Sequence, residues 1–147
     1  MAKKKQIQYA GFWIRLAAKL IDLFILALLL ALPFYLLNFL ATGSPIPKEL
    51  PTFVYIYIFL WFIIFILYDI YFIKKYNATP GKMIMRIKVV KADNSSVTWA
   101  TSIVRWIIYK LGSGWWVLFL GVLWIIWDEK KQGWHDKVAN TYVIRTK

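Results

Sequence analysis

Long apolar stretches dominate the pattern of hydrophobic and polar positions along this chain. Residues 23–41 form a run of nineteen positions that only Pro33 and Asn38 interrupt, and residues 53–73 form a run of twenty-one positions with a single charge, Asp69. At the helical rise of about 1.5 Å per residue, nineteen residues reach about 28 Å, close to the roughly 30 Å hydrocarbon core of a bilayer. The pattern therefore predicts two transmembrane helices, over about 14–41 and 53–73.

A third apolar region, residues 103–127, is less regular. It carries Arg105 and Lys110, and Gly112-Ser113-Gly114 interrupts it just before Trp115-Trp116. A Gly-Ser-Gly triplet breaks helices, and paired Trp side chains favour the membrane interface over the bilayer centre. Two interpretations remain open: one tilted span, or two short helices that form a hairpin at the Gly-Ser-Gly turn.

Two short stretches have the pattern of strands rather than helices. Residues 86–89 alternate between polar and apolar side chains, residues 142–145 are rich in β-formers, and residues 93–96 form a turn cluster. Short strands at a membrane surface need each other's backbone groups, so we expect these two to pair. The expected fold is an all-α polytopic membrane protein with a small cytoplasmic β element.

Composition and charge agree with a membrane protein and give it an orientation. Of the 147 residues, 61% are hydrophobic, too many for a soluble enzyme of this size, and the net charge is +12. Six cations against Asp93 occupy residues 74–102, and five more occupy residues 128–147, whereas the 41–52 loop holds only Lys48 and Glu49. The positive-inside rule then predicts a multi-pass protein of the cell membrane with both termini in the cytoplasm, which favours the hairpin.

The surplus of cations suggests contact with anionic lipid headgroups rather than with nucleic acid, because the apolar runs require a bilayer. The chain has no Cys and a single His, so we expect neither a metal site nor a disulfide. It shows no nucleophile with a plausible base and no phosphate-loop motif, so we expect neither an enzyme nor a cofactor.

Charged residues near the first two spans are the candidate site. Arg15, Lys19 and Asp22 share one helical face that Gln8 extends backwards, and Asp69 lies at a depth similar to that of Asp22 in an antiparallel second helix. Charges inside a span are usually paired or functional. One interpretation is a structural cluster in which Arg15 and Arg105 neutralise the two carboxylates; the other is a cation or proton site on one carboxylate. His135 and Asp136 form a second tier, as a polar turn or a proton relay.

Several segments that carry these residues match a known pattern. They are Gly11-Phe12-Trp13, Arg15, Asp22, Asp69, Thr79-Pro80-Gly81-Lys82, Ile87-Lys88-Val89-Val90, Gln132-Gly133-Trp134-His135-Asp136-Lys137 and Ala139-Asn140-Thr141. In this order they resemble the RDD family of integral membrane proteins, named for an Arg and two Asp that Arg15, Asp22 and Asp69 match one for one. The resemblance implies a single membrane domain over residues 1–147. It also implies a role in transport, since some members are similar to cation/proton antiporters.

Two functions follow as hypotheses. The first is a transporter of Na⁺, K⁺ or H⁺, or a subunit of one, with Asp69 as the exchanging carboxylate and Asp22 as a structural one. So few helices can hardly enclose a pathway, so this hypothesis implies a homo-oligomer. The second is a non-transporting membrane scaffold or assembly factor that binds anionic lipid or a partner protein.

Overall fold

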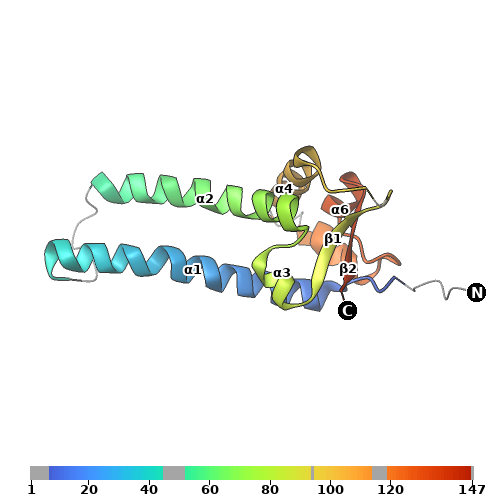
Figure 1. Cartoon of the computed structure of the whole chain (residues 1–147), viewed down its shortest axis with the longest axis horizontal. Coiled ribbons are helices and arrows are strands. Elements are labelled where there is room, and N and C mark those ends of the chain that lie inside the picture. Colours follow the sequence, from blue (N-terminus) through green and yellow to red (C-terminus); the bar gives the residue numbers. More distant parts are fainter. Residues whose placement is uncertain (1–6, 45–51, 94, 114–118, 147) are drawn as a thin grey trace, which may run out of the picture.

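Two long antiparallel helices and a compact cap at one end make up the molecule (Figure 1). The structure is a computed structural model that describes residues 7–44, 52–93, 95–113 and 119–146. Helix α1 spans Phe12–Thr42 and helix α2 spans Thr52–Tyr76. Within the described residues, these are the two helices that are long and apolar enough to cross a membrane. The predicted all-α membrane architecture is thus confirmed.

Helix α1 begins and ends where its sequence allows. Gly11 is the N-cap, and Gly43 closes the other end in the left-handed conformation, with its N–H bonded to the carbonyl of Phe39. The segment that precedes helix α1 differs from the expectation, because residues 8–10 do not continue the helix. Gln8 therefore does not extend the charged face, because its carbonyl accepts a hydrogen bond from the Arg145 N–H of the last strand.

Short elements follow the second long helix and build the cap. They are α3 (Pro80–Ile84), β1 (Ile87–Lys91), α4 (Trp99–Ser113), α5 (Phe119–Leu123), the 3₁₀ helix η1 (Trp124–Ile126), α6 (Trp134–Val138) and β2 (Thr141–Arg145). Strands β1 and β2 pair antiparallel with Val89 opposite Val143, which confirms the predicted β element. On the other side of β2, Tyr9 bridges Ile144.

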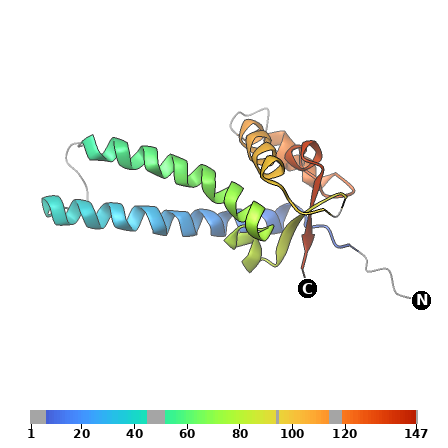
Figure 2. The same cartoon turned by 45° about the horizontal axis from the view of Figure 1, so that its top comes forward.

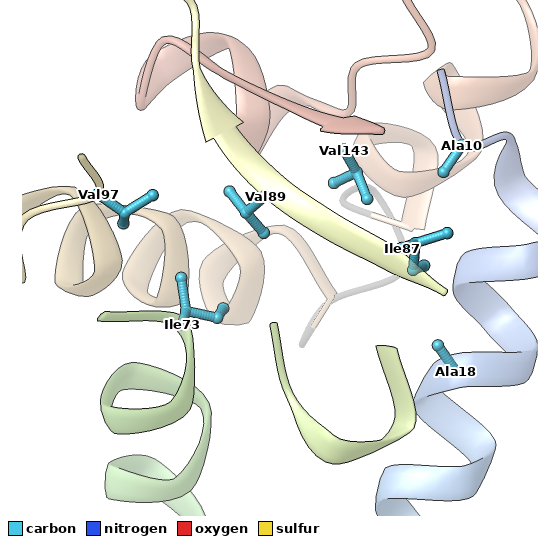
Figure 3. Close-up of a cluster of buried hydrophobic side chains, with 7 residues drawn as sticks. All are labelled: Ala10, Ala18, Ile73, Ile87, Val89, Val97 and Val143. Carbon is cyan, nitrogen blue, oxygen red and sulfur yellow. The ribbon is translucent and has the colours of Figure 1, made fainter. Parts of the chain in front are cut away.

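The sheet and the helix ends share one apolar core (Figure 3). Ile87 and Val89 of β1 and Val143 of β2 are buried together with side chains from both long helices. Those side chains include Ala18 of α1 and Ile73 of α2. Burial of this apolar surface fixes the cap onto the ends of the two helices.

The third apolar region contributes α4 and α5, which contact each other. The expected turn at Gly114 and the Trp115-Trp116 pair lie outside the described residues. Strand β1 precedes this region and β2 follows it. Because the two strands pair, the chain enters and leaves the region at the same end of the molecule (Figure 2). This geometry agrees with the hairpin and not with a single span.

Candidate functional site

Asp22 is the point where α1, α2 and α3 meet. Asp22 is 1% exposed, and its carboxylate accepts three hydrogen bonds from neutral donors. The hydroxyl of Tyr68 donates at 2.9 Å, the hydroxyl of Thr79 at 2.5 Å and the backbone N–H of Gly81 at 2.7 Å. A buried carboxylate needs such donors, so Asp22 ties the second helix and the following turn to the first helix.

Arg15 and Arg105 share one carboxylate, that of Asp136 in α6. Arg15 Nη1 lies 2.5 Å from Asp136 Oδ2, and Arg105 Nη1 contacts Asp136 Oδ1. Arg15 also donates to the carbonyls of Ala10 and Lys131, and Arg105 donates to the hydroxyl of Thr141. One buried anion therefore holds α1, α4 and α6 together.

This arrangement determines the protonation states of two α6 side chains, Asp136 and His135. Burial alone would raise the pKa of Asp136, but the charges of Arg105, of the His135 ring when it is protonated and of Arg15 outweigh it and hold that pKa far below its usual range. Burial lowers the pKa of His135 to about 4 against the opposing pull of Asp136. At neutral pH, Asp136 is therefore ionised and His135 is neutral.

Asp69 has a partner of its own in the first helix. Its Oδ2 accepts a hydrogen bond from Lys19 Nζ at 2.8 Å, and the pair joins α1 to α2. The ammonium group of Lys19 lies 5.7 Å from the ring centroid of Phe65 and 5.7 Å from that of Tyr109. These contacts hold the ammonium group near aromatic faces of α2 and α4.

A cavity of about 160 Å³ lies among these groups. Side chains from α1, α2, α3, α4, α5, η1, α6 and β2 contribute to its wall. Its polar lining comprises the Lys19–Asp69 pair, Arg15, Lys82, Arg105, Trp106, Tyr109 and His135. The rest of the wall is apolar and includes Phe12, Leu16 and Ile73.

The structure places the predicted residues together but pairs them differently. Arg15, Asp69, Arg105 and His135 line the cavity, whereas Asp22 and Asp136 are not among its lining residues. The interpretation in which the two arginines neutralise Asp22 and Asp69 is wrong about the partners, because both guanidinium groups bind Asp136.

Sequence reasoning also missed part of the site. Lys19 was placed on the charged face of the first helix but not assigned to Asp69. Lys19 lies one turn before Asp22 on the same face, and Asp69 has a depth similar to that of Asp22, so this placement could have suggested the pair. Lys82 entered the sequence analysis only as part of the Thr79–Lys82 segment, and Trp106 did not enter it, because only the packing of α3 and α4 brings both side chains to the cavity.

Two helices of membrane-spanning length, a hydrogen-bonded cap and buried ion pairs at their junction define an α-helical membrane protein. The chain belongs to the RDD family, whose profile matches residues 9–140. It is 32% identical over 141 residues to the uncharacterized membrane protein YteJ of Bacillus subtilis (strain 168), covering 95% of this chain and 82% of that protein. It is 34% identical over 140 residues to the uncharacterized protein YckC of the same strain, covering 91% and 83%. No solved structure matches it.

Proposed function

We propose that this protein is a non-transporting membrane scaffold that holds a basic cap at the inner face of the cell membrane. The observation that carries the proposal is that the charged side chains near the spans are bound to partners within the fold. Arg15 binds Asp136, Lys19 binds Asp69, and Asp22 accepts three hydrogen bonds from neutral donors. Each of these groups joins elements of the fold, which is the role expected of structural charges in a membrane.

Packing between the long helices supports the same proposal. Just beyond Asp22, Leu26 and Leu30 of α1 and Tyr68 of α2 form a buried cluster. Trp61, Phe65 and Phe72 pack against that cluster. An ion crossing a single copy along this line would have to displace the apolar and aromatic side chains of this cluster.

Cation or proton exchange is the second candidate, and one observation favours it. The Lys19–Asp69 pair lines the cavity, so a proton or a cation entering that cavity could compete with Lys19 for the carboxylate. The surroundings argue against a cation, because Lys19, Lys82 and Arg105 line the same cavity. An exchange pathway would also require several copies of the chain.

A flux assay separates the two candidates. Purified full-length protein would be reconstituted in liposomes with an internal pH dye, an imposed pH gradient, and Na⁺ or K⁺ outside. We expect proton flux no faster than in protein-free liposomes, while an added K⁺/H⁺ ionophore collapses the gradient as a positive control. Ion-dependent flux that Asp69→Asn abolishes, and that the matched surface variant Asp93→Asn leaves unchanged, would replace the scaffold proposal by exchange.

A further inference from the structure

Two buried hydrogen-bond donors at the cavity have no acceptor. Arg105 Nε and Trp106 Nε1 are both inaccessible to solvent and make no hydrogen bond within the described parts of the chain. Both side chains line the cavity, and Arg105 as a whole is only 4% exposed. Buried donors without a partner are rare in folded proteins, so these two indicate an acceptor that occupies the cavity.

The charges around the cavity indicate which sign of charge the acceptor has. Four cations line it, namely Arg15, Lys19, Lys82 and Arg105. Asp69 pairs with Lys19, and the two arginines share the single charge of Asp136. No carboxylate of the described residues lies within ion-pair distance of Lys82 Nζ. The surplus is positive, and it faces a partly apolar space where electrostatic attraction is stronger than in water.

The size and the position of the cavity further restrict which anions fit. Engineered cavities of about 150 Å³ hold a molecule as large as benzene, so about 160 Å³ accommodates a tetrahedral oxyanion. The wall joins Phe12, at the start of α1, to Ile73, near the end of α2. In a protein that spans the membrane with these helices, this is the level of the lipid headgroups.

We propose that the cavity binds an oxyanion of the phosphate class, with Lys82 supplying the charge and with Arg105 Nε and Trp106 Nε1 donating hydrogen bonds. The anion is either free phosphate or the phosphate of an anionic lipid headgroup, and both present the same oxygen acceptors. Binding of a lipid headgroup rests on the proposed function, which places the cap at the membrane surface, whereas binding of free phosphate does not. Charge-assisted hydrogen bonds from a lysine and an arginine suit such an anion.

Binding measurements on the full chain in detergent test the site. One arm titrates inorganic phosphate calorimetrically, and the other counts bound phosphatidylglycerol against phosphatidylcholine by native mass spectrometry. Lys82→Gln should weaken binding about tenfold or more, because a charged hydrogen bond is lost. Trp106→Phe, which removes the donor and keeps an aromatic ring, should weaken it by a smaller factor. Lys88→Gln, which removes an exposed lysine of β1, is the matched control and should bind like wild type.

The arms and variants give distinct outcomes. Saturable phosphate binding that Lys82→Gln loses identifies a free anion as a ligand, and preferential retention of phosphatidylglycerol that the same variant loses identifies a headgroup. Absence of both, or equal loss in Lys82→Gln and Lys88→Gln, overturns the site. Lys82 has no ion pair to lose, so Lys82→Gln should unfold at the same temperature as wild type, which separates lost binding from lost folding. The flux result is independent: flux together with binding overturns the scaffold and leaves the anion site standing.

Discussion

At Gly81 the backbone of α3 approaches α1 so closely that no side chain fits between them. A Cβ at this position would lie 2.1 Å from the carbonyl oxygen of Ala18 and 2.9 Å from Asp22 Cγ. Moving α3 away would break the hydrogen bond from the Gly81 N–H to Asp22. We expect Gly81→Ala to lower the free energy of unfolding by about 1–3 kcal/mol, measured by thermal unfolding in detergent.

Gly11→Ala is the control for this prediction. A Cβ on Gly11 meets nothing within 4 Å, so only the weaker preference of an N-cap for glycine over alanine is lost. A Gly81→Ala protein as stable as the Gly11→Ala protein would show that the contact between α1 and α3 is looser than described.

His135 should make the folded protein sensitive to mild acid. Its pKa is about 4 in the fold because the ring is buried, against about 6.5 in an unfolded chain. Between these values the unfolded state takes up a proton that the folded state does not, so stability falls as the pH drops from 6.5 to 4. The total loss is about 3 kcal/mol. Thermal unfolding between pH 4 and pH 8 should show it, and His135→Gln should flatten the profile while leaving its low-pH end dependent on Asp136.

At the scale of elements, Asp136 is the anion on which three helices depend. Asp136→Asn would leave the guanidinium groups of Arg15 and Arg105 buried with no carboxylate between them. Removing one partner of a buried ion pair costs about 3–5 kcal/mol, so this variant should yield little folded protein by gel filtration. Arg15→Gln leaves Arg105 on Asp136 and should cost less. Asp93→Asn, at an exposed turn, is the control, and an equal yield from it and from Asp136→Asn would contradict a structural role of the buried pair.

The elements also show how far the sequence predicts the fold. Apolar runs of membrane length predicted α1 and α2, and alternation predicted β1 and β2, because each signal lies within one segment. The five-residue helices α3 and α6 are too short to show a period. Asp136 binds an arginine 121 positions away, a pairing that no local spacing encodes. The depth match of Asp22 and Asp69 placed them at the right end of the spans, but the partners of each come from the packing.

On the scale of the whole molecule, the sheet sets which segments share a side. The backbone of residues 8–10 bonds to β2, and β2 pairs with β1. Three segments from the beginning, middle and end of the chain therefore lie at the same end of the long helices, whereas the far ends of α1 and α2 lie opposite (Figure 1). A membrane crossed by both helices must leave all three segments on one side.

The charge distribution then decides which side this is. Residues 74–102 carry six cations against Asp93, and the loop at the opposite end holds only Lys48 and Glu49, so the cap should face the cytoplasm. The chain has no Cys, so single cysteines report position directly. We expect Thr146→Cys to escape an impermeant thiol reagent in intact cells and to react after permeabilisation, and Ser44→Cys to react in both. The reverse pattern would invert the orientation. Labelling of both in intact cells would separate β2 from the side of the other cap segments and contradict the sheet.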